Sequence, residues 1–423
     1  MYIVISKPKR MSVKAGVVHC IECLLLVGMK SVLQSSVHFC SAAAATLCKI
    51  NAMLNPLPTR SSRARSDRRN PAWPQARTLS VDGVTRMAYR VVGQPEGDSW
   101  LVLHGGPGSG CHPGMLRPFD LARQQVIAPD QRGSGLSSTR GSTLGNSTPR
   151  LVADLENLRL SLGIKRWSIL AGSWGTVLAL RYVQAHPHAV QGLLMRGTFG
   201  LRRREIEGVL ARQATGLAGR QMPQTWPRSA YANASTTLGR LAKVLQVGAP
   251  SVAGRNAIRF WSQQELARAL KGQHRARLHL MSGFNRDLAN EARAVWAGSH
   301  RQLRRAQAQQ RRTGMLATDR QGWQKFRLQA HYLRHRGYTR PNDLTRAVLS
   351  LAHHGIDSTW IHGRFDAVCP VANSRDYVEL LLRQPGTHQV DSQWPDAGHL
   401  GGEPGIHQQL SASLREQKRE TST

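Results

Sequence analysis

Short apolar segments alternate with helical segments along much of the sequence, and this alternation limits the possible folds more than any other feature. Four of the apolar runs have the length of buried strands: 100–103, 125–128, 167–171 and 190–195. Helical periodicity occupies 151–162 and 176–185. Because a helix between two strands returns the chain to the same edge of a sheet, the strands pair in parallel. The sequence therefore predicts an α/β fold with a mostly parallel central sheet.

The points at which this alternation starts, stops and resumes predict the domain organisation. Residues 1–75 include an Arg/Ser tract that is typical of disorder, so we expect a disordered or non-native N-terminal extension. Residues 76–198 form the first part of the α/β core. Residues 199–345 have helical character without strand signals, which indicates a helical cap inserted over the sheet. Residues 346–423 return to the α/β pattern and form the second part of the core.

The positive charge of the chain raises the question of nucleic-acid binding. Lys and Arg number 58 against 25 Asp and Glu, and the formal net charge is +33 at pH 7. The basic residues are spread along the chain, and no zinc-finger spacing, RNP-like string or basic zipper organises them against a groove. We therefore expect a solvated basic face and no specific nucleic-acid partner, with non-specific binding at low salt.

Membrane, metal and cofactor sites are not indicated by the sequence. The mildly apolar stretch 17–33 is interrupted by polar and charged residues, so we expect no membrane span and a cytoplasmic location. Cys20 and Cys23 form a C-x-x-C pair, but no second Cys or His pair stands at zinc spacing. We expect neither a metal nor a cofactor, and the sequence leaves the oligomeric state open.

Residues 171–175 read AGSWG and lie between a predicted strand and a predicted helix. This context is the one that a nucleophile elbow requires, because the sharp turn exposes its serine above the sheet. Gly172 and Gly175 are small enough for so tight a turn, and Ala171 replaces the usual first glycine with the next smallest residue. Ser173 is therefore the candidate nucleophile, although a structural turn could have the same sequence.

A glycine-rich segment, HGGPG at 104–108, follows the predicted strand 100–103. Hydrolases that have a nucleophile elbow place an oxyanion loop at this point, and glycine lets a backbone N–H approach the substrate closely. We expect the N–H groups of Gly106 and Trp174 to form the oxyanion hole. Gly105 is expected to contact substrate, and His104 can be purely structural.

An acid and a histidine follow in the second α/β part. Asp366 stands after the predicted strand 358–362, and His399 lies on a loop before the last predicted helix, 406–414. The chain order Ser, Asp, His is that of α/β-hydrolases. Ser173 needs a base because a hydroxyl is a weak nucleophile near neutral pH. His399 would take the proton and later deliver it to the leaving group, and Asp366 would orient the imidazole.

These motifs together resemble the proline iminopeptidases (prolyl aminopeptidases), a family within the α/β-hydrolases. The resemblance extends from about residue 78 to about residue 409. Its most specific strings are HGGPG at 104–108, DQRGSG at 130–135, GSWG at 172–175 and GRFDAVCP at 363–370. The resemblance implies release of an N-terminal proline from a peptide, without metal or cofactor. It also implies that Asp130 and Arg132 fix loops rather than catalyse.

The resemblance further implies that the cap recognises the free amino terminus. The family uses two cap glutamates, which bind an ammonium group through charge-assisted hydrogen bonds. Glu265, in the string WSQQE, matches the first of them. Gln329 occupies the place of the second; it accepts a hydrogen bond but has no charge, which puts the proline selectivity in doubt. Phe199 matches the residue that packs on the proline ring.

The sequence therefore predicts a serine aminopeptidase whose partner is a peptide with an N-terminal proline. Two other hypotheses stay open. The first is a serine esterase or amidase of the same fold with relaxed or altered specificity. The second is a basic binding protein with a vestigial hydrolase core, against which the intact set of Ser173, Asp366 and His399 argues.

Overall fold

The computed structural model describes residues 72–416, with gaps at 212–222, 224–225, 227–232, 247 and 249. They belong to one compact unit, Asn70–Thr423. The expected extension, 1–75, lies outside the described residues except for its last four, and the C-x-x-C pair lies outside them as well.

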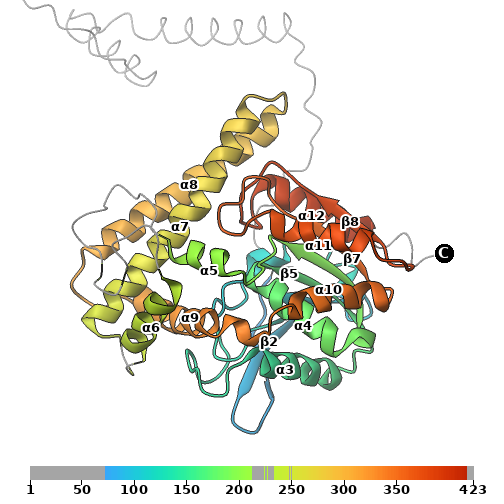
Figure 1. Ribbon diagram of the computed structural model, residues 1–423, viewed down its shortest axis with the longest axis horizontal. Helices are drawn as coiled ribbons and strands as arrows, with labels where there is room; N and C mark the ends of the chain where they lie inside the picture. Colours follow the sequence, from blue (N-terminus) through green and yellow to red (C-terminus); the bar gives the residue numbers. More distant parts are fainter. Residues whose placement is uncertain are drawn as a thin grey trace, which may run out of the picture. The chain divides into compact units, whose positions relative to one another are not determined.

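The described residues form an 8-stranded sheet with the strand order β1-β2-β4-β3-β5-β6-β7-β8 (Figure 1). The strands are β1 Arg77–Ser80, β2 Arg86–Gly93, β3 Asp98–Leu103, β4 Gln124–Pro129, β5 Trp167–Gly172, β6 Val190–Arg196, β7 Asp357–Ile361 and β8 Val390–Gln393. β2 runs antiparallel to both β1 and β4, and every later pairing is parallel. The predicted mostly parallel sheet is confirmed.

Helices cover both faces of this sheet. They are α3 Thr148–Ser161, α4 Trp174–Ala185, α10 Asp343–His353, α11 Ala372–Leu382 and α12 Pro404–Glu416. In β3, Leu101 and Leu103 belong to the core under α3, α4, α10 and α11, whereas Trp100 and Val102 belong to the core under α12. Successive strand residues point to opposite faces. Because both faces of the central strands are buried, β3, β5 and β6 are largely apolar rather than alternating, whereas the edge strands β1 and β8 are mostly polar.

Between β6 and α10 the described residues form helices and turns, with no strand among them. The helices are α5 Arg203–Leu210, α6 Ala234–Leu245, α7 Val252–Met281, α8 Arg286–Gln310 and α9 Ala317–Arg334. α7 and α8 lie side by side as a long hairpin (Figure 1). The ring of Trp261 on α7 stacks on Phe326 of α9, with centroids 4.8 Å apart, so the two helices are joined by a buried aromatic contact.

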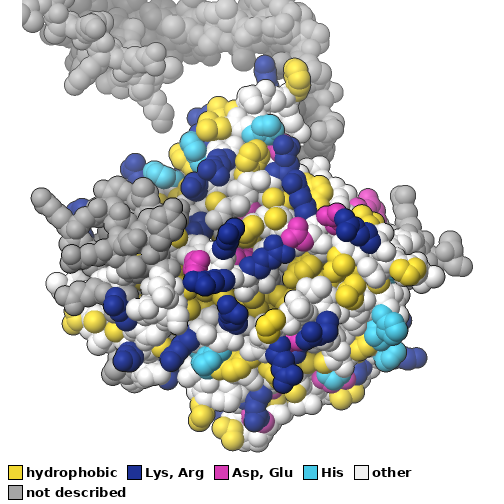
Figure 2. All heavy atoms as spheres, viewed as in Figure 1, with side chains coloured by type: hydrophobic (Ala, Val, Ile, Leu, Met, Phe, Trp, Pro, Cys, Tyr) yellow, Lys and Arg dark blue, Asp and Glu magenta, His cyan; other side chains and the backbone are white. Residues whose placement is uncertain are grey.

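Basic side chains are scattered over the face drawn in Figure 2, between hydrophobic and uncharged groups, rather than gathered in one patch. Some of the basic side chains form buried ion pairs within the protein. Arg259, for example, makes two hydrogen bonds, of 2.8 and 2.6 Å, to the buried carboxylate of Asp319 in the cap. Among the described residues, no helix combines the length and the apolar character that crossing a bilayer requires.

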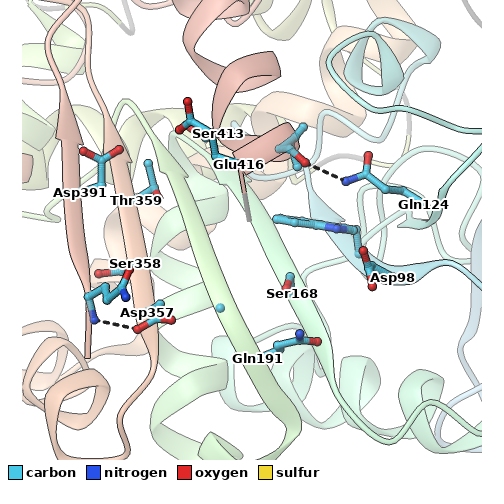
Figure 3. A pocket seen from close by; sticks show the side chains of 14 residues that line it. Asp98, Gln124, Ser168, Gln191, Asp357, Ser358, Thr359, Asp391, Ser413 and Glu416 are labelled. Carbon is cyan, nitrogen blue, oxygen red and sulfur yellow. Dashed lines mark hydrogen bonds between the residues drawn. The ribbon is translucent and has the colours of Figure 1, made fainter. Parts of the chain in front are cut away.

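A hollow of about 410 Å³ lies over the amino-terminal ends of the parallel strands (Figure 3). Asp98, Ser168 and Asp357, at or near the starts of β3, β5 and β7, help to line it. Ligands of open α/β sheets bind at the opposite edge, outside the carboxyl ends of the strands. None of the residues Ser173, Asp366 and His399 lines this hollow, so it is not the candidate active site.

Glu205 is buried where the cap begins. Its carboxylate accepts hydrogen bonds from the N–H of Gly200, at 2.8 Å, and from Nδ2 of Asn373, also at 2.8 Å. Burial raises the pKa of Glu205 to about 8, although these hydrogen bonds act in the opposite direction. The folded chain therefore holds a proton here at pH values at which an exposed glutamate has lost it.

We expect the free energy of unfolding to fall as the pH rises from 4.5, the ordinary pKa of this group, to about 8. Over that window the unfolded chain releases the proton that the folded chain keeps, at about 1.4 kcal/mol per unit of pKa difference. Urea denaturation at a series of pH values should show a flatter profile for Glu205→Gln than for the wild type. The exposed Glu379→Gln is the matched control, and identical profiles for all three proteins would contradict the prediction.

Candidate active site

Ser173 stands between the last residue of β5 and the first residue of α4, with φ 55° and ψ −124°. Positive φ is uncommon outside glycine and costs on the order of 1–3 kcal/mol, so the surrounding structure must impose it. The predicted helix 176–185 begins two residues earlier, at Trp174. This difference matters for the N–H of Trp174. The first N–H groups of a helix have no hydrogen-bond partner within the helix, so this N–H is available to another acceptor.

The two glycines of the elbow are required by close packing, Gly172 against a side chain and Gly175 against backbone. A methyl group on Gly172 would lie 2.1 Å from Nη2 of Arg196, and one on Gly175 would lie 2.5 Å from the carbonyl oxygen of Leu103. Neither position has room for a side chain. The N–H of Ser173 donates to the carbonyl oxygen of Arg196 at 3.0 Å, which joins the turn to the end of β6.

Asp366 and His399 meet at the carboxyl end of β7. Nδ1 of His399 lies 2.7 Å from Oδ2 of Asp366, whose side chain is completely buried. The other oxygen, Oδ1, accepts hydrogen bonds from the N–H groups of Val368 and Cys369 at 2.7 and 2.9 Å. The loop after β7 therefore fixes the carboxylate, and the carboxylate in turn fixes the imidazole.

Asp366 is a strong acid in this environment. Burial alone would raise its pKa, but the attraction of His399 and the hydrogen bonds from His362 and His399 outweigh burial and hold the pKa of Asp366 well below its usual range. An ionised carboxylate accepts the Nδ1–H of His399, and the other ring nitrogen, Nε2, is then available as a base.

Ser173 and His399 are linked through Arg196. Its carbonyl oxygen accepts from the N–H of Ser173, and its Nη1 donates to the carbonyl oxygen of His399 at 2.5 Å. The contact that Oγ of Ser173 makes is with Sγ of Cys369, at 4.0 Å; no hydrogen bond joins it to His399 within the described part of the chain. Catalytic hydrogen bonds are often long before substrate binds and shorten in the complex.

A buried glutamate fixes the loop that carries His399. Glu403 accepts hydrogen bonds from the N–H groups of Gly398, at 2.6 Å, and Leu400, at 2.8 Å. These are the two residues on either side of His399. Burial raises the pKa of Glu403 to about 7, against the effect of these hydrogen bonds.

The predicted oxyanion loop lies directly against the elbow. A methyl group on Gly105 would lie 3.0 Å from the carbonyl oxygen of Gly172 and 3.1 Å from Cβ of Ser173. Gly106 has φ +41°, a conformation that favours glycine. Behind the loop, Nε2 of the buried His104 accepts the N–H of Gln131 at 3.1 Å, so this histidine has a structural role.

Asp130 and Arg132 tie neighbouring loops together, in agreement with the expectation for them. Asp130 accepts hydrogen bonds from the N–H groups of Cys111 and Leu136 at 2.7 and 2.8 Å. Arg132 makes two hydrogen bonds to Asp154, of 2.9 and 2.6 Å. All of these bonds run between protein groups, so they hold the scaffold around the site.

Helix α7 crosses the acid and histidine loops at Gly272. A methyl group there would lie 2.6 Å from the carbonyl oxygen of Phe365 and 3.3 Å from Cα of Gly398. Glu265 stands seven residues earlier on the same helix. Seven residues are about two turns, or roughly 10 Å, so Glu265 is on the face that carries Gly272 toward the site.

The structure brings Glu265 and Gln329 together. Nε2 of Gln329 donates to Oε1 of Glu265 at 2.5 Å, and Gln329 is 5% exposed. Oε1 of Gln329 has no hydrogen-bond partner among the described residues and lies 3.8 Å from the point that a methyl group on Gly106 would occupy. Phe199 is buried in the main core, with its N–H donating to Thr176, and its role in binding stays a prediction.

Three residues that hold the site in place were not identified from the sequence: the buried His362 and Glu403 and the partly buried Arg196. Nε2 of His362 lies 3.2 Å from Oδ2 of Asp366, and its Nδ1 lies 2.8 Å from Oγ of Ser374. A usable signal was present, since each of the three is a polar residue next to a motif or at the end of an apolar strand.

Among the described residues, no group of three or more His, Cys, Asp or Glu side chains could hold a metal ion.

Comparison with known proteins gives consistent matches. Residues 101–403 match the family model described as the alpha/beta hydrolase fold. The chain is 31% identical over 330 residues to a proline iminopeptidase of Xylella fastidiosa (strain 9a5c), covering 77% of this chain and 91% of the relative. It is 33% identical over 342 residues to a proline iminopeptidase of Xanthomonas citri, covering 78% and 92%.

Among solved structures, the chain is similar to a thermophilic esterase from Thermogutta terrifontis. The TM-score is 0.51 at 17% sequence identity, and the match covers 83% of this chain and 100% of the esterase. At this identity the similarity concerns the fold alone.

We expect His362→Leu to lower the rate of ester hydrolysis roughly tenfold to hundredfold, because the carboxylate of Asp366 loses the charge-assisted hydrogen bond that His362 donates. His362→Gln keeps an N–H at a similar reach and should restore part of the loss. The measurement is kcat and KM on a chromogenic acetate ester, and we expect kcat to fall while KM stays unchanged. Equal activity of the Leu variant and the wild type would show that His362 does not position the acid.

Proposed function

The chain belongs to the proline iminopeptidase family of α/β-hydrolases, and we propose that it is a serine aminopeptidase that releases N-terminal proline from peptides. The observation that best supports this proposal is that an acid–histidine pair and a pair of polar cap residues both lie close to the elbow. Asp366 and His399 are hydrogen-bonded at 2.7 Å, and the Glu265–Gln329 pair lies over the oxyanion loop that touches Ser173.

The proposed reaction starts with Ser173. Its Oγ attacks the carbonyl carbon of the N-terminal residue while Nε2 of His399 takes the hydroxyl proton. The imidazolium that forms is stabilised by Asp366, whose depressed pKa keeps it ionised. The buried hydrogen bonds to Asp366 prevent the carboxylate from turning away, so the imidazole keeps one orientation through the cycle.

The negative oxygen of the tetrahedral intermediate would be bound by the N–H groups of Gly106 and Trp174. Each such donor is worth roughly 3–4 kcal/mol of barrier lowering. The ring of Trp174 packs on Tyr332 of α9, with centroids 4.8 Å apart, so the cap helps to fix this donor. His399 then protonates the leaving amine, and water releases the acyl group by the reverse sequence of proton transfers.

Recognition of the amino terminus is assigned to the cap. Oε1 of Gln329, which has no partner among the described residues, lies above Gly106, and Glu265 supplies a carboxylate that is hydrogen-bonded to Gln329. Gly105 would allow the substrate to approach the elbow, and Phe199 would contact the proline ring.

A serine esterase or amidase with relaxed specificity remains the second candidate, because Gln329 brings no charge to the amine site.

The two described cysteines, Cys111 and Cys369, are free thiols, which suits a reducing compartment such as the expected cytoplasm.

We expect the purified protein to cleave both a chromogenic proline amide and a chromogenic acetate ester, and Ser173→Ala to abolish both activities. The ester reports the acylation machinery alone, whereas the amide also needs the amine site. Turnover of the ester without turnover of the amide would overturn the peptidase proposal in favour of the esterase. Steady-state kinetics on the two substrates make the distinction.

Gln329→Glu should raise kcat/KM for the proline amide roughly tenfold, because a second carboxylate strengthens the attraction for an ammonium group. The ester should be unaffected. Gln408→Glu makes the same change in charge on the exposed face of α12 and serves as the control. If the amide kinetics of the two variants are alike, position 329 does not face the substrate amine.

A further inference from the structure

A lysine occupies the proposed amine site. Lys325 stands one helical turn before Gln329 on α9, and its Nζ donates to Oε2 of Glu265 at 2.5 Å. The side chains of Lys325 and Glu265 are 28% and 27% exposed, so this ion pair is partly shielded from water. Cε of Lys325 lies 3.5 Å from the point that a methyl group on Gly106 would occupy. The ammonium group is therefore next to the oxyanion loop, where a substrate amine is expected.

The charges around this point do not favour a cation. Glu265 contributes one negative charge, Lys325 cancels it, and Gln329 contributes none. From α7, Arg268 adds another positive group close to Glu265; its guanidinium donates to the carbonyl oxygens of Val209 and Ala211 at 2.8 and 2.6 Å. A protonated prolyl amine would have to displace Lys325 or lie beside it.

Besides the hydroxyl of Ser109, whose Oγ lies 2.9 Å from the point that a methyl group on Gly106 would occupy, the hydrogen-bonding groups near that point are the remaining N–H donors of Lys325 and one acceptor on Gln329. An ammonium has three N–H donors, and Glu265 is the hydrogen-bond partner of Lys325 among the described residues. Oε1 of Gln329 is a buried acceptor that has no partner among the described residues. The bond from the amide nitrogen to Glu265 fixes the orientation of this amide, because the oxygen in its place would face a carboxylate. Lys325 and Gln329 each place an atom within 4 Å of the same point above Gly106. The site therefore offers an N–H and a C=O side by side, without net negative charge.

We infer that this site accepts an uncharged five-membered lactam, the N-terminal 5-oxoprolyl residue, alongside or in preference to the prolyl residue. The lactam N–H would donate to Oε1 of Gln329, and the lactam oxygen would accept from Nζ of Lys325 in a charge-assisted hydrogen bond. Lys325 is then the residue that determines specificity between the two rings. The inference rests on the proposed acyl-enzyme mechanism and changes only the acyl group.

The reaction balances as an ordinary hydrolysis. The amide bond after 5-oxoproline breaks, Oγ of Ser173 forms an ester to the acyl carbon, and the peptide leaves as an amine with the proton from His399. Water then cleaves the ester to release 5-oxoproline and restore Ser173. No oxidant, reductant or cofactor is needed.

The test compares kcat/KM for a 5-oxoprolyl amide and a prolyl amide that carry the same chromophore. Lys325→Met removes the charge at nearly constant length, and we expect it to lower turnover of the 5-oxoprolyl amide about tenfold and to raise that of the prolyl amide about tenfold. Lys325→Arg keeps the charge and should keep the wild-type preference. Lys165→Met, at an exposed position, is the control for loss of one positive charge.

Opposite shifts on the two substrates support the inference, because a general loss of structure would lower both. Parallel shifts, or no turnover of the 5-oxoprolyl amide by the wild type, overturn it. Turnover of the prolyl amide by the wild type tests the proposed function separately. If the Met variant does not fold, calorimetric titration of Ser173→Ala with 5-oxoprolinamide and with prolinamide decides the question, and failure to bind the lactam overturns the inference.

Discussion

The site depends on a serine backbone held in a conformation that serine rarely adopts. Ser173 stands at the end of β5 with φ 55° and ψ −124°, and this turn persists because its neighbours leave no alternative. Gly172 packs on the guanidinium of Arg196, Gly175 packs on the end of β3, and the oxyanion loop presses on the turn through Gly105. The same contacts that impose the conformation bring the two proposed oxyanion donors to the nucleophile. The same packing therefore accounts for the strained backbone of Ser173 and for the arrangement of the proposed oxyanion hole.

The core and the cap contribute in different ways. In the core, backbone atoms and buried polar groups fix the positions: Asp366 has its donors, and Glu403 binds both sides of the His399 loop. In the cap, the groups proposed to face the substrate are the ends of the side chains of Glu265, Lys325 and Gln329. The end of a side chain can be exchanged without moving the backbone, so the proposed amine site can change while the hydrogen bonds that fix Asp366 and His399 stay the same.

Much of this arrangement could be predicted from the sequence, because it depends on local patterns. The strands before and after the elbow, the motif order and the loops of Asp366 and His399 follow from short strings in predicted contexts. β8 was not predicted, since its residues, Val390–Gln393, are mostly polar and form an edge strand. The pairing of Lys325 with Glu265 joins residues 60 positions apart on two helices, and no local spacing reveals it.

The contact at Gly272 sets how closely the cap approaches the acid and histidine loops. Because this residue has no side chain, the backbone of α7 rests on the carbonyl oxygen of Phe365 and on Gly398, and the helix forms a low ceiling over the acid and histidine loops. A side chain at position 272 would therefore push a cap helix away from the two loops that hold Asp366 and His399.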